Sequence, residues 1–461
     1  MREREPGTLN LKELARAIFE HALAESSIQW SLDRLLRTTA GTQGTRLTLN
    51  GEDVLALDRL KQVRIVAIGK AAAPMLTALL SRLPLPPTCD FEGVLIAVER
   101  PQNLPSTVQF FAGGHPVPNE ASFAGARAAL STLQSVSASS PDESLCIFLI
   151  SGGASAMMEL PLDPAISLQD TVAFHQALVH CGASIVEINC VRKHFSAVKG
   201  GRLALAAGSA QKISLLVSDV PPAHLDALAS GPTLPDPTSV AECHEIIARY
   251  KLLDRFPESV RTYFASPDLA ESPKPKDLIS RSWKLLDSDE LAEAARSHAV
   301  QLGFHTIIDN TCDDWSHDAA ADYLLNRLRQ LRREHPKVCL ISAGEVTVQV
   351  ATTPANRAQH IGGRNQHLAL YLATQLRPTD TPLAVLSAGS DGIDGNSNAA
   401  GAIIDEHTLD GDDRRRSAQQ ALEAFDSSTW LSAIGATIVT GPTGQNLRDL
   451  RILLALEPPT N

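Results

Sequence analysis

The chain has 461 residues, which exceeds the roughly 100 to 150 residues of a common domain and predicts more than one hydrophobic core. Its apolar content of 44% and charged content of 20% are typical of folded soluble proteins and exclude a disordered or fibrous chain. The formal net charge of −11 would repel phosphate backbones, so nucleic acid is excluded as a partner, and an anionic substrate needs a few local cations or a metal.

No targeting or membrane signal is visible. The N-terminal segment MREREPGTLN is polar and lacks the apolar stretch of about 7 to 15 residues found in signal peptides. No apolar run approaches the roughly 20 residues that span a bilayer. The seven cysteines are odd in number, scattered and without a CxxC pair, so neither a disulfide framework nor a zinc site is indicated. We expect a reduced, cytoplasmic protein with no membrane contact.

Short aliphatic and β-branched runs recur through the first half of the chain and are typical of buried strands. These runs are VRIVAIG, GVLIAV, LCIFLI and ISLLVS, which end at Gly69, Val98, Ile150 and Ser218. Helices are expected over residues 71–83, 120–133 and 168–181, each long enough to cross over a parallel sheet. The alternation predicts an N-terminal, doubly wound, Rossmann-like α/β domain over residues 1–250.

Residues 251–282 include SPDLAESPKPKD, whose Pro, Ser and charge content is typical of a connecting segment. Residues 283–461 resume the alternation and predict a second α/β domain. Its expected strands are WKLLD, VCLIS, VTVQV and PLAVLSAG, followed by the glycine-dense loop SAGSDGIDGNSNAAGA. The leucine-bearing stretch after GPTGQN is expected to form a C-terminal helix.

In an open α/β sheet, ligands bind outside the carboxyl ends of the strands. Lys70 directly follows the first strand and would place an ammonium group there as a phosphate or other anion site. Ser151, Gly152 and Gly153 follow the third strand, with Ser155 at the next helix start, and this turn would let the backbone approach a ligand. A solvated lysine and an ordinary tight turn are the alternatives, because the chain has no GxxxxGK[ST] loop.

The segment INCVRKHFSAVKGGRLA is strongly basic within an acidic chain. At helical spacing, Arg192 and Lys199 would share one face across two turns and could bind an anion, although a solvated basic face is equally compatible. Asp219 ends the strand ISLLVSD, where a carboxylate is well placed to hold magnesium or to orient a substrate hydroxyl.

Polar loops of the second half repeat this arrangement. Glu345 follows the strand LISAG, and Arg364 and Asn365 come directly after two glycines at a predicted helix start. An arginine there can bind a carboxylate or phosphate in bidentate fashion. Gly444 and Asn446 lie in another glycine loop near the C-terminus. We expect these residues to contact nucleotide or substrate.

Asp391 and Asp394 lie in the loop GSDGIDGNSNAAG and could bind magnesium beside nucleotide phosphates, with water completing the coordination. A calcium loop starting at Asp394 is a weaker interpretation, because Ala399 occupies the position that such a loop needs for glycine. Turn chemistry without a metal is equally compatible with these Asp, Asn and Gly residues.

Together, these segments resemble the glycerate 2-kinases whose C-terminal half is called the MOFRL domain. The resemblance covers nearly the whole chain and rests on the ordered motifs VAIGKAA, GGHPVPNEAS, LISGGASAM, INCVRKHFSAVKGGRLA, LLVSDVPP, ASGPTLPDPTS, ISAGEVTVQV, GGRNQHLAL, SAGSDGIDGNSNAAGAIID and GPTGQNLRDL. It implies transfer of the γ-phosphoryl group of ATP to the 2-hydroxyl of D-glycerate, with Mg²⁺ or another divalent cation, in a cleft between the two domains.

Within that resemblance, Lys70 matches the family's catalytic lysine and Arg364 matches the arginine of its GGRNQ motif. Our hypothesis is that Lys70 and Arg364 bind the transferring phosphoryl group and the glycerate carboxylate. Asp219, Asp391 or Asp394 would hold Mg²⁺ or orient the attacking hydroxyl, because phosphoryl transfer depends on alignment and charge stabilisation.

Three positions depart from the family pattern. Ala154 replaces the third glycine of SGGGS, Asp287 stands where a glycine often opens a turn, and His367 replaces a common Glu. These departures lie in or beside the predicted ligand-binding loops. They therefore bear on nucleotide affinity and acceptor choice more than on the family assignment.

Two other functions stay open. Proteins of this kind have also been labelled hydroxypyruvate reductases, but no GxGxxG follows a strand here, so the nicotinamide fingerprint is missing. A non-catalytic organic acid binding protein would also have two α/β domains around a cleft, although such proteins are usually exported. The sequence does not distinguish a monomer from a homodimer.

Overall fold

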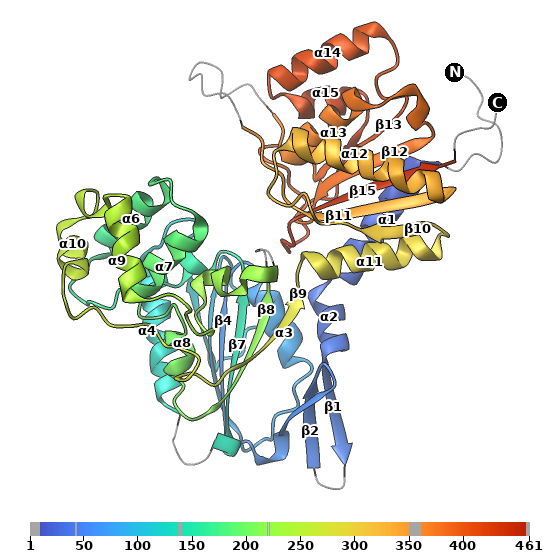
Figure 1. Ribbon diagram of the computed structural model, residues 1–461. Helices are drawn as coiled ribbons and strands as arrows, with labels where there is room; N and C mark the ends of the chain where they lie inside the picture. Colours follow the sequence, from blue (N-terminus) through green and yellow to red (C-terminus); the bar gives the residue numbers. More distant parts are fainter. Residues whose placement is uncertain are drawn as a thin grey trace. The chain divides into compact units, whose positions relative to one another are not determined.

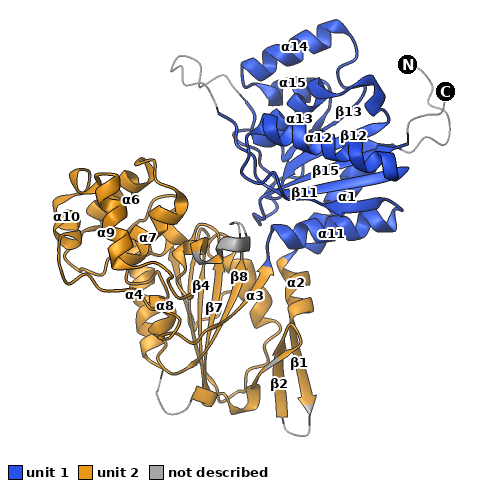
Figure 2. Ribbon diagram, in the orientation of Figure 1, with its two compact units in different colours: residues 1–27, 286–461 blue, residues 28–285 orange. Residues whose placement is uncertain are grey.

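The computed structural model describes residues 10–41, 44–136, 141–218, 220, 222–349 and 361–457 (Figure 1). The chain divides into two compact units (Figure 2). One comprises residues 28–285, and the other combines residues 1–27 with residues 286–461. Each unit is an α/β structure built on a six-stranded sheet, as the alternation of strands and helices predicted.

The sheet of the unit 28–285 confirms the strands predicted from the apolar runs. In spatial order it contains β6 (Val108–Ala112), β5 (Asp90–Ala97), β4 (Gln62–Ile68), β7 (Ser144–Ser151), β8 (Gln211–Val217) and β9 (Arg281–Leu286). The strands from β6 to β8 are parallel. Because both faces of such a sheet are covered, its strands are apolar throughout, and every residue of β7 is buried.

The helices expected between these strands are present, with ends that differ from the prediction by at most three residues. The α-helices of this unit are α2 (Ile28–Leu35), α3 (Ala72–Leu80), α4 (Glu120–Gln134), α5 (Ala154–Met157), α6 (Leu168–Val179), α7 (Ile185–Phe195), α8 (Arg202–Leu205), α9 (Val240–Arg249) and α10 (Glu258–Phe264). A small antiparallel sheet was not anticipated from the sequence: β1 (Leu36–Gly41), β2 (Gly44–Leu49) and β3 (Glu52–Ala56). Throughout the described ranges, no helix has both the length and the apolar character needed to cross a membrane.

Much of the segment expected to connect two domains packs inside this unit. Phe256, Val260 and Phe264 are buried in an apolar cluster with Phe174 and Phe195 of α6 and α7. Burial of the aromatic residues around α10 therefore keeps this segment within the unit, despite the nearby Pro- and Ser-rich stretch. The unit extends to residue 285.

The sheet of the other unit is mixed. Its order is β10 (His305–Ile308), β11 (Lys337–Gly344), β15 (Asp449–Leu456), β12 (Leu383–Gly389), β13 (Gly401–Asp405) and β14 (Thr437–Ile438). Its α-helices are α1 (Leu11–Glu25), α11 (Ser288–Gln301), α12 (His317–Glu334), α13 (Arg364–Gln375), α14 (Asp412–Glu423) and α15 (Ser427–Ala433). Helices α12 and α13 pack on one face of the sheet, and α1 and α11 cover the other (Figure 1).

Three predictions for this unit are wrong. The expected strand at WKLLD is β9, which lies in the sheet of the other unit. The expected C-terminal helix is the central strand β15, which pairs antiparallel with both β11 and β12. Burial on both faces explains its continuous run of leucines, because tertiary context overrides helix propensity. The expected strand VTVQV is not a strand over residues 346–349, where Thr347 forms only an isolated bridge with Ser316. Since β15 begins at Asp449 opposite Gly344, no strand continues beside this segment.

Helix α1 belongs to the unit of residues 286–461 rather than to the N-terminal domain of residues 1–250. Its apolar face, which includes Ala15, Ile18 and Phe19, is fully buried, and the helix contacts β12, β15 and α11. An amphipathic pattern predicts that a helix covers a sheet, but it does not specify which sheet.

Candidate active site

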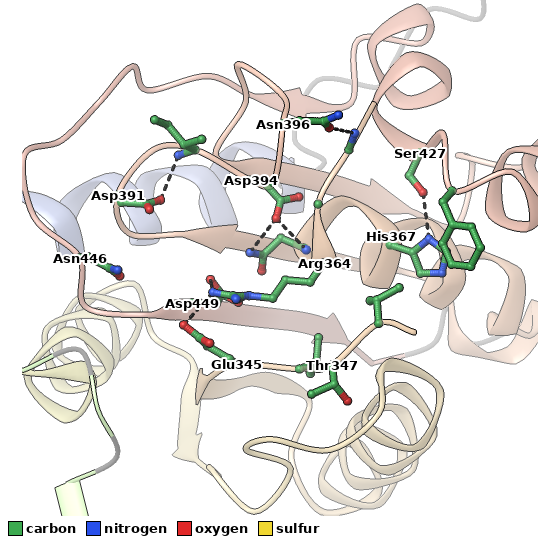
Figure 3. A pocket seen from close by; sticks show the side chains of 18 of the residues that line it. Glu345, Thr347, Arg364, His367, Asp391, Asp394, Asn396, Ser427, Asn446 and Asp449 are labelled. Atoms are coloured by element: carbon green, nitrogen blue, oxygen red, sulfur yellow. Dashed lines mark hydrogen bonds and ion pairs between the residues drawn. The ribbon is translucent and has the colours of Figure 1, made fainter. Parts of the chain in front are cut away.

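The unit of residues 286–461 contains a polar pocket of about 820 Å³ (Figure 3), here called the α13 pocket. It lies where β11 and β12 end, β15 begins and α13 starts, and Arg364, Asn365 and Asn446 are among its lining residues. Carboxylates dominate its walls: Asp314, Glu345, Asp391, Asp394 and Asp449. Four loops singled out in the sequence therefore meet in one place. Gly444 of the C-terminal glycine loop is not among the lining residues.

Asp394 fixes the start of α13. Its Oδ1 accepts a hydrogen bond from the backbone N–H of Asn365 at 3.0 Å, and its Oδ2 accepts one from that of Gln366 at 2.8 Å. A Cβ on Gly363 would lie 2.2 Å from Asp394 Oδ1, so this close approach requires glycine. Burial raises the pKa of Asp394 to about 6, although the helix N–H groups oppose that shift. Asp394 thus positions the residue that begins the helix, Arg364.

Arg364 is held by two carboxylates (Figure 3). Its Nε donates to Asp449 Oδ2 at 2.5 Å, and its Nη2 donates to Asp449 Oδ1 at 3.1 Å and pairs with Glu345 Oε1 at 2.7 Å. Burial would lower the pKa of Arg364, but hydrogen bonding to Asp449 raises it overall. Burial also raises the pKa of Glu345, against the attraction of Arg364. The side chain of Arg364 is 38% exposed. No described residue forms a hydrogen bond or an ion pair with its Nη1.

The donor set for a metal is limited. Among the residues whose placement is described, no group of three His, Cys, Asp or Glu side chains could hold an ion. Both oxygens of Asp394 accept hydrogen bonds from α13, whereas Asp391 uses only Oδ1, for the N–H of Ile393 at 3.0 Å. Mg²⁺ often takes only one or two protein carboxylates beside substrate phosphates. Asp391 fits that role, and Asp394 has a structural one.

In the unit of residues 28–285, the turns after β4 and β7 bind each other. The backbone N–H of Lys70 donates to the carbonyl oxygen of Gly152 at 2.9 Å, and that of Ala71 donates to Ser151 Oγ at 3.0 Å. Ser151 is buried and thus joins the turns rather than contacting solvent. Lys70 is exposed, and no described side chain forms an ion pair with it. An exposed lysine without an ion-pair partner among the described residues therefore lies at the carboxyl ends of two adjacent parallel strands.

Gly69 makes this junction possible. It has φ +114°, and a Cβ there would lie 2.4 Å from Ser151 Oγ and 2.5 Å from the carbonyl oxygen of Ser151. We expect Gly69→Ala to reduce the free energy of unfolding by about 2 to 4 kcal/mol, measured by urea denaturation. Gly182 is the matched control, since it has φ +85° with open space around it, and Gly182→Ala should cost only about 1 to 2 kcal/mol. Equal losses would contradict this explanation.

Beside these turns lies a second pocket of about 460 Å³, here called the α6 pocket. Gly153, Ser155 and Arg192 of the predicted site residues line it, together with His115 and His175, which the sequence analysis did not select. Gly153 has φ +84°, and a Cβ there would lie 3.2 Å from Lys70 Cγ and 3.0 Å from His115 Cδ2. Lys70 thus lies against the glycine that borders the pocket.

The expectation that Arg192 and Lys199 share a helix face is wrong, because α7 ends at Phe195. Lys199 is buried, and its ammonium pairs with Glu159 Oε2 at 2.5 Å. It therefore does not reach a ligand in the α6 pocket. Glu159 itself was not predicted, since nothing local in MMELP marks a buried ion pair. Asp219, the third predicted catalytic residue, lies outside the described residues.

The departures from the family pattern have local structural roles. Asp287 caps α11, where its Oδ1 accepts hydrogen bonds from the N–H groups of Asp289 and Glu290. His367 is buried beside Ser427, and burial lowers its pKa to about 4, so its ring is neutral near pH 7. Ala154 is buried at the start of α5.

Two α/β units, each with a pocket at strand ends, define a two-domain α/β protein of the kind that binds small ligands. Residues 14–265 match a domain of unknown function, DUF4147, and residues 338–449 match the MOFRL family. The chain belongs to the family that combines these two domains, in which glycerate 2-kinases occur.

Individual relatives agree with this assignment. The chain is 31% identical to the D-glycerate 2-kinase of Thermotoga maritima, over 96% of both chains. It is 34% identical to a protein of Agrobacterium vitis named "Putative hydroxypyruvate reductase", over 85% of this chain and 86% of that one. The crystal structure of a glycerate kinase from T. maritima superposes with a TM-score of 0.80 at 30% identity, covering 97% of this chain and 99% of the other.

Proposed function

We propose that this protein is a glycerate 2-kinase that transfers the γ-phosphoryl group of ATP to the 2-hydroxyl of D-glycerate, giving 2-phosphoglycerate and ADP. The observation that carries the proposal is the exposed side chain of Lys70, which forms no ion pair with a described residue and lies at the junction of two glycine turns. An acidic protein that binds a triphosphate needs such a local cation. Relatives over nearly the whole chain that are named glycerate 2-kinase support the same activity.

The residues of this chain suit a reaction that depends on positioning and charge. The oxygen of the 2-hydroxyl forms a bond to the γ-phosphorus, the bond to the β,γ-bridging oxygen breaks, and the hydroxyl proton is lost. Lys70 would stabilise negative charge on the transferring group. Arg364, oriented by Asp449 and Glu345, would bind the glycerate carboxylate through Nη1. That the reaction takes place between the two halves of the chain stays a prediction.

A divalent cation, Mg²⁺ in our proposal, would neutralise charge on the phosphates when it is bound. Asp391 is the described carboxylate best suited to hold it. Among the described residues, only the N–H of Ile393 donates to its side chain, whereas Asp314 and Glu345 each pair with an arginine. Asp394 is assigned instead to the start of α13. We further propose a cytoplasmic location, as expected for an enzyme of small soluble metabolites, and leave monomer and homodimer both open.

Phosphorus NMR of the product from D-glycerate, ATP and MgCl₂ tests the activity. Formation of 2-phosphoglycerate is expected; 3-phosphoglycerate would contradict the regiochemistry, and no product would contradict the kinase. A parallel incubation with hydroxypyruvate and NADPH, followed by absorbance, tests the reductase named among the relatives. Rapid oxidation of NADPH would overturn our choice.

A further inference from the structure

The two pockets differ sharply in charge. Five carboxylates line the α13 pocket, and its Arg364 is already paired with two of them. Among the described residues, no Asp or Glu lines the α6 pocket, which instead contains Arg192 and three histidines. We propose that the α6 pocket binds the nucleoside triphosphate, with the base against the apolar face of α6 and the phosphates toward Arg192 and Lys70. This inference rests on the proposed function, in which ATP is a substrate.

Arg192 forms no ion pair with any residue that the structure describes. Its Nε is buried and has no hydrogen-bond partner in the structure. The nearby Glu159 is fully buried and binds Lys199 at 2.5 Å and His175 at 2.8 Å. Burial lowers the pKa of His175, which leaves its ring neutral near pH 7. Among the described residues, the Glu159 carboxylate is thus the acidic group that acts on both Lys199 and Arg192. An anionic ligand at Arg192 would balance the excess positive charge.

One face of α6 lines the pocket and contributes two valines beside His175 and Gln176. Val172, His175, Gln176 and Val179 line it, at the i, i+3, i+4 and i+7 positions that share a helix face. Pro116, Val117, Pro118 and Ala156 add further apolar surface. Flat aromatic bases bind against such surfaces, whereas a small hydroxy acid would leave most of 460 Å³ unfilled.

Lys70 connects this pocket to the proposed chemistry. Gly153 borders the pocket, and Lys70 Cγ lies 3.2 Å from the position of a Cβ on that glycine. A triphosphate anchored at Arg192 and extending past Gly153 would bring its terminal phosphate to the Lys70 ammonium. The glycine is required on this path, because a side chain would contact both Lys70 and His115.

Titration calorimetry of the full chain with ATP and MgCl₂, and separately with adenosine, tests the assignment. Arg192→Met should weaken ATP binding by about tenfold or more and change adenosine binding by less than about twofold, because adenosine has no phosphate. Val179→Trp should weaken both ligands by about the same factor, at least tenfold, because it fills the base site. Val186→Trp is the matched control, since Val186 is 48% and Val179 57% exposed and Val186 does not line the pocket. It should leave both affinities unchanged.

Thermal unfolding of each variant checks the fold, and Arg192→Lys, which keeps the charge, should retain part of the ATP affinity. The assignment is overturned if wild type binds no ATP, or if both pocket variants bind ATP normally and instead raise the KM for D-glycerate. If ATP binding follows the expected pattern but no 2-phosphoglycerate forms, the pocket assignment stands and the proposed acceptor is wrong.

Discussion

Lys70→Ala is expected to lower kcat/KM for phosphorylation of D-glycerate by about 10²- to 10³-fold, the usual loss when one preorganised charge-stabilising group is removed. The side chain of Lys70 is exposed and forms no ion pair with a described residue. The free energy of unfolding should therefore change by less than about 0.5 kcal/mol. Coupled-enzyme kinetics and urea denaturation measure the two quantities.

Lys61→Ala is the matched control, because Lys61 immediately precedes β4 whereas Lys70 follows it. Its side chain is 71% exposed and pairs with Glu143 at 2.8 Å. This variant removes the same charge from the opposite end of the strand and should keep kcat/KM within about twofold. Full activity of Lys70→Ala, with an intact fold, would remove the central residue of the proposed function.

Glu159→Gln should reduce the free energy of unfolding by about 3 to 5 kcal/mol, because it leaves the buried ammonium of Lys199 without a countercharge. Glu159 Oε2 lies 2.5 Å from Lys199 Nζ and 2.8 Å from His175 Nε2, and both members of the ion pair are at most 1% exposed. The double variant Glu159→Gln/Lys199→Met should recover part of this loss. Urea denaturation measures each variant.

The exposed pair of Arg261 and Glu258 provides the comparison, since the Glu258 side chain is 80% exposed. Glu258→Gln should cost less than about 1 kcal/mol. If Glu159→Gln cost no more than Glu258→Gln, the buried ion pair would have no special role in this unit.

The same residue predicts acid sensitivity. Burial alone would raise the pKa of Glu159, but Lys199 and His175 lower it far below the ordinary 4.5. A carboxyl group with a depressed folded-state pKa stabilises the fold above its unfolded pKa, and this stabilisation is lost as the pH falls below about 4.5. Wild type should therefore lose more stability than Glu159→Gln does when the pH falls from about 5 to about 3, since the unfolded-state pKa of the carboxyl group lies between these values.

Local sequence pattern predicted the parallel strands of the unit 28–285 and the polar groups at their ends. Lys70, Gly153 and Glu345 each come shortly after a run of buried residues, and Arg364 follows two glycines at a helix start, so local pattern was sufficient to place them. The same reasoning missed His115, because its loop follows the short strand β6, which no apolar run marked.

Pairing over long sequence separations could not be read from the chain. Arg364 binds Asp449, 85 residues away, and Lys199 binds Glu159, 40 residues away. The leucine-rich end of the chain suits a helix or a buried strand equally well, and only insertion between β11 and β12 selects the strand. Sequence alone determined which chemical groups are present and which strand ends carry them. The tertiary structure decided which charges are neutralised and which stay available, because ion pairing depends on burial and on distances set by sheet register.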